Sequence, residues 1–449
     1  MHYEKFQDGT VKCIEDEIPF EVPEGWAWCK LNDIYNFIDY RGATPTKITN
    51  GIPLVTAKNV KSGYIDYTID DYISEEEFKE RQQRGISKKG DILFTTEAPL
   101  GNAALADMEK FSAGQRLITF QQYGSKNELI NYVMLMFILS DFFQQQLYVN
   151  KTGSTVAGIK AAILKTLWIP VPPYNEQLRI SNTLKSAINL IDSISKNKEI
   201  LSTSISNTKS KILDLAIRGK IVPQDPNDEP ASVLLERIRA EKEELIKQGK
   251  IKRDNKVSVI FKGDDNSYYG IHLPDSWNWA SLREIALSIS DGSHNPPPNN
   301  GSGIPLLSAA NINDNSILMN EISRWITNEE WKIENQRTNI EVGDVLLTIV
   351  GSIGRSAVVQ NNNHFALQRS VAVIKPCLIN PLYLMHIVQS PQIQKWLTDN
   401  SKGTAQKGIY LNALSLMIIP IPPLAEQARI VEHIHIAYKH LDLISNALL

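Results

Sequence analysis

A long heptad pattern of apolar positions occupies the middle of the chain. From residue 180 to residue 215 its positions advance by alternating steps of four and three residues, and most are apolar or alanine. The pattern comprises Ile180, Leu184, Ala187, Ile191, Ile194, Lys198, Leu201, Ile205, Thr208, Ile212 and Leu215. Such a repeat is typical of a coiled-coil helix, which over this length would be a rod of roughly 54 Å. An ordinary amphipathic surface helix is the alternative interpretation.

A shorter seam of the same kind lies near the other end of the sequence. It comprises Ile430, Ile434, Ala437, Leu441, Ile444 and Leu448. Because a heptad seam needs a partner helix, we expect the two helices to pair with each other in antiparallel orientation. The second seam is shorter, so the expected coiled coil is uneven. The rest of the helix surface could accept helices of another protein.

The sequence around these helices contains two copies of one pattern, about 250 residues apart. The matched segments, in chain order, are 23–26 with 274–277, 51–54 with 303–306, 90–93 with 343–346, 115–116 with 368–369, 153 and 158 with 403 and 408, and 169–177 with 419–427. Matches that keep one order at a nearly constant offset indicate a repeat of whole domains, not a solenoid of short units.

Each copy mixes strand and helix patterns. Short apolar runs predict buried strands at 91–95 and 116–120, and at 344–348 and 370–374 in the second copy. Longer periodic stretches predict helices at 127–149 and 380–399. We expect Trp26 and Trp277 to anchor the cores. The predicted fold class is α+β: two pseudo-repeated domains of about 150 residues, separated by long helices that form an antiparallel coiled coil.

The same patterns divide the chain into six segments. We expect an N-terminal segment at 1–22 that packs with the repeat, a first domain at 23–174, a spacer helix at 175–216, a linker with a helix at 217–273, a second domain at 274–424 and a second spacer helix at 425–449. Asn175 is a plausible N-cap, with Glu176 in the first turn. The linker helix is predicted at about 231–248, ended by Gly249 and followed by a basic tail at 250–256. A solvated linker is the favoured interpretation, and phosphate contact by the tail is the alternative.

Composition excludes several protein classes. The chain has 449 residues, of which 42% are hydrophobic and 22% charged, as in globular proteins of two or three domains. Its three cysteines form no CxxC pair, so neither a disulfide framework nor a zinc site is expected. Neither a membrane-spanning run nor a signal peptide is expected. The net charge of −3 does not by itself indicate nucleic-acid binding.

Fragments that look like catalytic motifs lack the residues that the chemistry needs. The segment Asn295-Pro296-Pro297-Pro298 has no aromatic residue for stacking on a flipped base. The paired glycines at 153 and 158 have P-loop spacing, but isoleucine stands where the phosphate-binding lysine should be. His433, His435 and His440 do not share one helix face, so no metal site is expected. With no catalytic residue predicted, duplicated domains around a rod indicate recognition.

The motif that ends each domain carries a family resemblance. Ile-Pro-x-Pro-Pro-x-x-Glu-Gln-x-Arg-Ile occurs at 169–180 and again at 419–430. Together with the two Gly-Asp-Ile/Val-Leu segments and the central stretch at 216–230, it strongly resembles the specificity subunit of type I restriction–modification systems. The resemblance spans almost the whole chain.

The resemblance implies a recognition subunit without catalytic activity of its own. Each domain would be a target-recognition domain that reads one half of a bipartite, asymmetric site in double-stranded DNA, with a fixed unread gap between the halves. Two methyltransferase subunits and two restriction subunits would be the partners, in the cytoplasm of a bacterium or archaeon. S-adenosylmethionine, ATP and magnesium would belong to those partners, which would methylate adenine and cleave DNA. The alternative is a non-catalytic coiled-coil adaptor that contacts no nucleic acid.

Polar loop residues are the candidates for contact with DNA, because arginine pairs with guanine and asparagine or glutamine with adenine in the major groove. In the first domain they are Arg41, Thr44, Thr46, Lys47, Lys58, Asn59, Lys61, Lys151, Thr152, Ser154 and Thr155. In the second domain they are Ser293, His294, Asn299, Asn300, Asn311, Lys402, Thr404, Gln406 and Lys407. The repeated Gln115-Arg116 and Gln368-Arg369 pairs are expected to have a structural or phosphate-binding role. Partner docking is assigned to Glu176, Gln177, Arg179, Glu426, Gln427 and Arg429.

Overall fold

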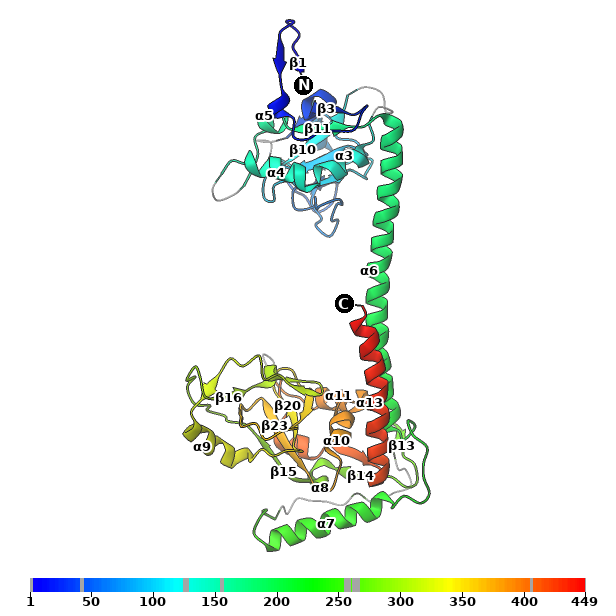
Figure 1. The fold of residues 1–449 in the computed structure, drawn as a ribbon, viewed down its shortest axis with the longest axis vertical. Coiled ribbons are helices and arrows are strands. Elements are labelled where there is room, and N and C mark those ends of the chain that lie inside the picture. Colours follow the sequence, from blue (N-terminus) through cyan, green and yellow to red (C-terminus); the bar gives the residue numbers. More distant parts are fainter. Residues whose placement is uncertain are drawn as a thin grey trace. The chain divides into compact units, whose positions relative to one another are not determined.

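The computed structural model describes residues 3–40, 44–123, 129–153, 157–253, 260, 267–403 and 407–448. The chain divides into two compact units, Met1–Ile194 and Ser195–Leu449 (Figure 1). We call the elements from β3 to β11 the first domain and those from β14 to β24 the second domain. Helix α6 (Tyr174–Ile217) begins in the first unit and ends in the second.

Three small sheets build the first domain. The largest is antiparallel in the order β4-β10-β7-β8, with β4 (Tyr35–Asp39), β10 (Leu117–Gln122), β7 (Ile92–Thr95) and β8 (Ala103–Leu105). The second has the order β6-β5-β9, with β6 (Tyr72–Ile73), β5 (Ile52–Val55) and β9 (Ser112–Ala113). The third pairs β11 (Trp168–Val171) with β3 (Ala27–Lys30). Strand β7 is buried along its whole length, which explains why it is a continuous apolar run.

The second domain repeats these three sheets. Its main sheet has the order β15-β23-β20-β21, with β15 (Ala286–Asp291), β23 (Val371–Pro376), β20 (Val345–Thr348) and β21 (Ser356–Val358). The smaller sheets are β19 (Trp325–Ile326), β16 (Ile304–Leu307) and β22 (Ala366–Leu367), and the pair of β14 (Asn278–Ser281) with β24 (Ile418–Ile421). A further hairpin joins β17 (Ile312–Asn313) to β18 (Ser316–Ile317). The predicted α+β fold with two repeated domains is confirmed.

The long helices predicted at 127–149 and 380–399 are each two helices. The first domain has α1 (Leu31–Ile34), α2 (Glu75–Arg81), α3 (Asn131–Ile138), α4 (Asp141–Val149) and α5 (Ala161–Leu164). The second has α8 (Leu282–Ile285), α9 (Asn328–Thr338), α10 (Pro381–Val388), α11 (Pro391–Asp399) and α12 (Leu411–Ser415). Ser140 caps the start of α4, and Pro391 stands in the first turn of α11, where a proline cannot continue the preceding helix. None of the described helices has an apolar stretch long enough to cross a lipid bilayer.

A short hairpin precedes each domain, and an aromatic residue of the same segment packs on the tryptophan strand that follows. Strands β1 (Tyr3–Lys5) and β2 (Val11–Cys13) lead to Phe20, whose ring packs edge-on against Trp28 of β3 at 4.9 Å. Strands β12 (Ser267–Tyr268) and β13 (Ile271–His272) bring Tyr268 edge-on to Trp279 of β14 at 5.2 Å. The two segments therefore have the same place in the repeat.

The predicted N-cap of the long helix is wrong by two positions. Helix α6 begins at Tyr174, so Asn175 lies inside its first turn. The carbonyl of Pro173 accepts hydrogen bonds from the N–H groups of Glu176 (2.8 Å) and Gln177 (3.0 Å) and thereby starts the helix. Helix α13 (Leu424–Asn446) begins in the same way after Pro423.

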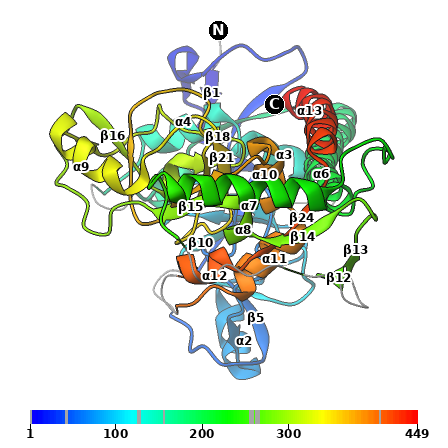
Figure 2. The same ribbon diagram turned by 90° about the horizontal axis from the view of Figure 1, so that it is seen from below.

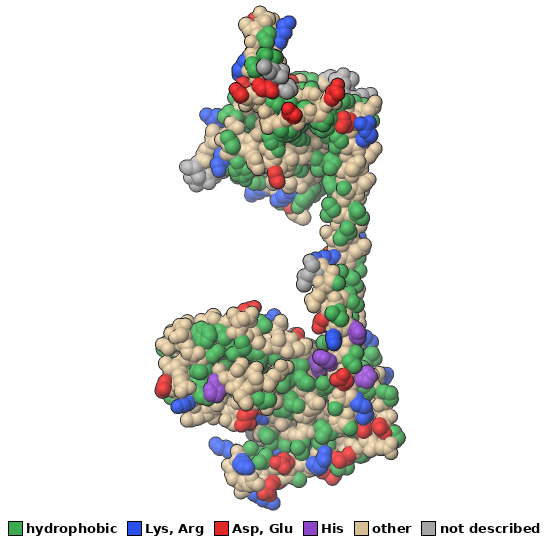
Figure 3. Space-filling view, viewed as in Figure 1, with side chains coloured by type: hydrophobic (Ala, Val, Ile, Leu, Met, Phe, Trp, Pro, Cys, Tyr) green, Lys and Arg blue, Asp and Glu red, His purple; other side chains and the backbone are tan. Residues whose placement is uncertain are grey.

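Helix α13 packs antiparallel along the part of α6 that belongs to the second unit (Figure 1). Ile430 and Ile434 are fully buried against the core that also holds Leu213 and Ala216, and Lys209 pairs with Asp442. The predicted antiparallel pairing is confirmed, but it covers only part of α6. On the uncovered part the seam is open to solvent: Ile191 is 60% and Ile194 58% exposed (Figure 3).

The linker helix α7 (Ala231–Lys247) has the predicted bounds, but the prediction that it is solvated is wrong. It lies across the second domain (Figure 2), with Leu234, Leu235 and Ile238 buried in the domain core. The ammonium group of Lys242 donates to three backbone carbonyls between residues 283 and 286. Of the predicted basic tail, Arg253 forms a two-bond ion pair with Glu243, and residues 254–256 lie outside the described residues.

Candidate DNA interface

The repeated glycines shape one loop in each domain. Thr152 and Gly158 exchange two backbone hydrogen bonds of 2.8 and 3.0 Å, as Lys402 and Gly408 do at 2.8 and 2.9 Å. The next residue then binds the edge of the main sheet, since Ile409 donates to the Ile349 carbonyl at 2.9 Å. The interpretation of these glycines as a backbone turn is confirmed.

The candidate residues of the first domain fall into two groups. Thr44, Thr46 and Lys47 form an exposed stretch with local partners, since Lys47 pairs with Asp71 at 2.6 Å and the Thr46 N–H donates to Glu77. Lys151 lies at the glycine loop, 5.3 Å from the ring centre of Tyr148. The remaining exposed lysines differ in their pairing: Lys61 lies 3.9 Å from Asp66, whereas Lys58 has no charged partner among the described residues.

The second domain brings two of its candidates together. His294, Lys402 and the neighbouring Arg369 line a hollow of about 300 Å³ beside the glycine loop. The ring Nε2 of His294 donates to the carboxylate of Asp291 at 2.7 Å, and that carboxylate also pairs with Arg337. We call this site the glycine-loop hollow. Lys407 stands exposed in the same loop, where its carbonyl accepts from Gly351 at 3.0 Å.

The other candidates of the second domain are tied into their own loops. The hydroxyl of Ser293 is buried and donates to Glu334 at 3.1 Å. Asn299 accepts from the N–H groups of Gly301 and Trp325, and the Asn300 N–H donates to the Trp325 carbonyl.

Five candidates of the two domains lie outside the described residues: Arg41, Ser154, Thr155, Thr404 and Gln406.

Asn59 and Asn311 occupy the same kind of place in the two domains. Asn59 is 3% exposed; its carbonyl accepts from Thr56, and its amide donates to the carbonyls of Asp66 and Ile69, both at 2.9 Å. Asn311 is 4% exposed, and its side chain bonds Ser308 and the Glu321 carbonyl. With their polar atoms used inside the loop, we now assign both residues to loop structure and no longer propose them as base readers.

Replacing Asn59 with alanine should therefore lower stability without changing sequence choice. Two carbonyls and one N–H in a partly buried site lose their partner, which should reduce the free energy of unfolding by about 2 kcal/mol. Urea unfolding would measure this loss, and Lys58→Ala is the matched control, because the exposed neighbour should leave stability unchanged. A normal stability for Asn59→Ala, together with a relaxed DNA target, would return Asn59 to the base readers.

The predicted partner-docking residues differ sharply in exposure. Gln177 and Gln427 are buried. The side-chain oxygen of each accepts a hydrogen bond from the backbone N–H of the residue that precedes an earlier helix, α3 for Gln177 at 2.8 Å and α10 for Gln427 at 2.9 Å. Glu426 is also buried. Burial raises the pKa of its carboxyl, and the hydrogen bonds from Trp277 and Gln224 partly oppose this shift. Arg429 forms a two-bond ion pair with Asp228 of the linker.

The equivalent groups of the first domain stand open. Glu176 and Arg179 have no ion-pair partner among the described residues, and Arg179 is exposed. The ring N–H of Trp26, the counterpart of Trp277, likewise has no hydrogen-bond partner in the described part of the chain. The contacts that the linker makes in the second unit thus have no equivalent around Trp26.

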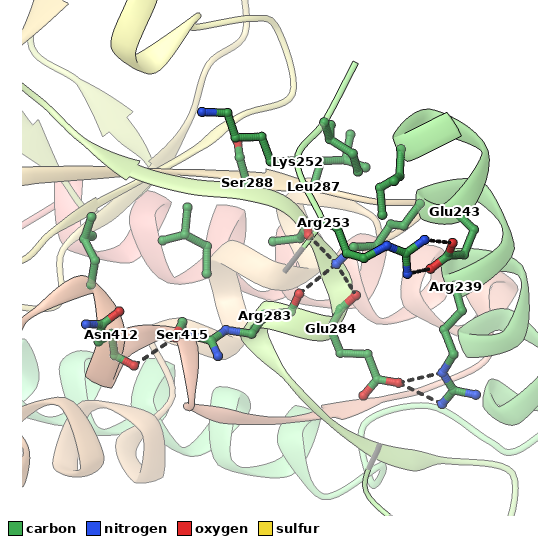
Figure 4. Close-up of a pocket in the computed structure, with 16 residues that line it drawn as sticks. Arg239, Glu243, Lys252, Arg253, Arg283, Glu284, Leu287, Ser288, Asn412 and Ser415 are labelled. Carbon is green, nitrogen blue, oxygen red and sulfur yellow. Dashed lines mark hydrogen bonds and ion pairs between the residues drawn. The ribbon is translucent and has the colours of Figure 1, made fainter. Parts of the chain in front are cut away.

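A cavity of about 510 Å³ lies between α7 and the second domain (Figure 4). Four of its charged residues form ion pairs with one another: Arg239 donates twice to Glu284, and Arg253 donates twice to Glu243. Arg283 donates to the hydroxyl of Ser415 at 2.7 Å. The Arg239–Glu284 pair holds α7 on the domain, and none of these three pairs is a nucleophile in contact with a base.

Strand register places the repeated Gln-Arg pairs one residue out of step. Leu117 faces Thr95 in the first domain and Val371 faces Thr348 in the second, so Leu117 and Val371 are equivalent. Counting back from these residues, Gln115 occupies the place of Arg369. The expectation that 115–116 and 368–369 are equivalent is wrong. The two Gln-Arg pairs have the same sequence, but the strand pairing shows that they are offset by one residue in the structure.

Comparison with known proteins agrees with the duplicated fold. The family model of the type I restriction modification DNA specificity domain matches residues 23–202 and again 274–448. The specificity subunit of the type I restriction enzyme EcoBI from Escherichia coli is 23% identical over 450 residues, covering 98% of this chain and 85% of that protein. The EcoAI specificity subunit from the same species is 33% identical over 240 residues, covering 51% of this chain and 38% of that protein.

Solved structures show the same fold. The crystal structure of the HsdS subunit from Thermoanaerobacter tengcongensis is similar, with a TM-score of 0.53, 18% identity, and coverage of 96% of this chain and 94% of that one. A chain from a structural study of complex assembly in the type I R-M system has a TM-score of 0.59 at the same identity. Because the family model matches both halves, this chain belongs to the type I restriction modification DNA specificity domain family.

Proposed function

We propose that this chain reads a bipartite, asymmetric DNA site, one short word for each domain, with an unread gap of fixed length between them. The observation that carries the proposal is a family-matched domain present twice with the same sheets but different side chains on its loops. Equal scaffolds with unequal loops suit two different words. The uninterrupted heptad pattern of α6 supports a fixed gap, because a coiled-coil helix is a stiff spacer.

The chain acts as a non-catalytic recognition subunit, and the reactions belong to its partners. We assign adenine methylation to two methyltransferase subunits and DNA cleavage to two restriction subunits. S-adenosylmethionine, ATP and magnesium would be bound by those subunits. The alternative of an adaptor without nucleic-acid contact is not favoured, because the matching family is a DNA specificity family.

The open part of α6 is the surface that we assign to partner helices. Leu190, Ile191 and Ile194 are each more than half exposed, and Leu201 continues the seam at 39%. Exposed apolar residues in a continuous stripe favour a protein interface. Glu176 and Arg179 lie at the start of the same helix and could form its polar rim.

Methylation mapping tests the proposal directly. Cells carrying the methyltransferase subunits with or without this chain would be compared by sequencing that detects methylated adenine. We expect two short words at one fixed spacing, present only with the chain. A methylation pattern that does not depend on the chain would refute the recognition role, and words at variable spacing would refute the fixed gap.

A further inference from the structure

The two domains carry different side chains at one equivalent place beside the glycine loop. Thr96 donates its backbone N–H to the carbonyl of Arg116 at 3.1 Å, and Ile349 donates in the same way to Ser370 at 2.9 Å. Gly114 and Gln368 each donate to the end of the neighbouring strand, at Val55 and Leu307. These bonds confirm that Gln115 and Arg369 are structural counterparts, independently of the strand register.

The surroundings of this place differ in charge between the domains. In the first domain Arg116 is neutralised by Glu97, with 3.0 Å between Nε and Oε1. The counterpart of Glu97 is Val350, as both contact the second glycine of the loop. Among the described residues Arg369 has no acidic ion-pair partner, and Lys402 stands where the first domain has Thr152. The second domain therefore presents Arg369 and Lys402 where the first presents Gln115 and Thr152.

Both side chains are available to a ligand. Arg369 is exposed at the rim of the glycine-loop hollow, whose apolar floor includes Ile349 and Ile409. Gln115 is half-buried, and the Thr44 hydroxyl donates to its carbonyl oxygen at 3.0 Å. This bond orients the amide and leaves its NH₂ group without a partner among the described residues. An amide held in this way suits direct readout.

We propose that Gln115 and Arg369 are equivalent base-reading residues, Gln115 for an adenine in one word and Arg369 for a guanine in the other. The inference rests on the proposed function and deepens it. Glutamine matches the N6 and N7 atoms of adenine, and the arginine fork matches O6 and N7 of guanine. A single shared place with these two residue types explains how one scaffold reads two different words.

The test uses the full chain in complex with its methyltransferase subunits, acting on a DNA library with random sequence. Arg369→Gln and Arg369→Lys should each weaken discrimination at one guanine of one word by about tenfold and leave the other word intact. Lysine keeps the charge but loses the planar fork, so a phosphate contact would tolerate it. Gln115→Arg should change one position of the other word only.

The matched control is Arg116→Gln, which makes the same change at the residue that only sequence matching equates with Arg369. It should leave both words unchanged. A uniform loss of methylation over all sequences in Arg369→Gln, or words that do not change in any variant, would overturn the inference while the proposed function stands. A wild-type complex that methylates no bipartite site would overturn both.

Discussion

Replacing Trp277 with alanine should lower the free energy of unfolding of the second domain by about 3–5 kcal/mol. The indole is 2% exposed and belongs to the largest apolar core of the second unit. Its ring also closes over Gly219 of the linker: a Cβ on that glycine would lie 3.2 Å from the ring and 2.5 Å from Pro274. The loss of Trp277 should therefore loosen both the domain and the linker that follows α6.

A hydrogen bond adds to the packing. The indole N–H donates to Glu426 at 2.9 Å, inside a site where that carboxylate is 1% exposed. In the Trp277→Ala variant one carboxylate oxygen loses its donor, which is costly because the group is buried. Trp277→Phe keeps most of the packing but not the donor, so the difference between the two variants separates apolar burial from the hydrogen bond.

Trp26 supplies the matched control at the equivalent place of the first domain. It is half-buried, and its N–H has no partner among the described residues, so Trp26→Ala should cost only about 1–2 kcal/mol. Hydrogen exchange followed by mass spectrometry would measure the two domains separately in one sample. Equal losses of protection for Trp26→Ala and Trp277→Ala would show that the linker contacts around Trp277 contribute little.

Repetition and periodicity were the reliable signals in the sequence. Each copy repeats the same backbone plan, so matched motifs predicted the duplicated α+β fold. The heptad steps predicted the antiparallel helices, because the period of a seam sets which face is buried. The place of α7 was missed, although Leu234, Leu235 and Ile238 share an apolar face, because the pattern shows that a face is apolar and not what covers it.

The candidate interface was less accessible to sequence reasoning. Asn59 and Lys58 are neighbours of similar polarity, yet one is buried in loop hydrogen bonds and the other is exposed. Which of two adjacent polar residues turns inward depends on loop contacts distant in sequence, here with Asp66 and Ile69. The one-residue shift at Gln115 and Arg369 has the same origin, since hydrogen bonds between strands, and not matching letters, determine which residues are equivalent.

The second domain should also lose stability as the pH falls from about 6.5 to about 4, because of His386. This side chain lies on α10 and is 7% exposed, and its Nδ1 has no hydrogen-bond partner among the described residues. Burial lowers its pKa to about 4, a hydrogen bond with Gln389 opposes the shift, and His435 adds to it. His386 lines a cavity whose other titratable or charged residues, besides His435, are Glu432, Tyr438, Lys439 and Asp442, all on α13.

The sign follows from where the proton binds. Below pH 6.5 the unfolded chain takes up a proton at this histidine, whereas the folded domain resists protonation down to about pH 4. Proton binding therefore favours the unfolded state between these two pH values. The loss of folding stability due to His386 should reach about 3 kcal/mol near pH 4. Urea unfolding between pH 4.5 and 7 should show wild type losing stability relative to His386→Phe, at up to about 1.4 kcal/mol per pH unit. His364→Phe is the control, because His364 is exposed and stacked on Trp331. If His386→Phe and wild type show the same pH slope, the acid sensitivity belongs to other groups.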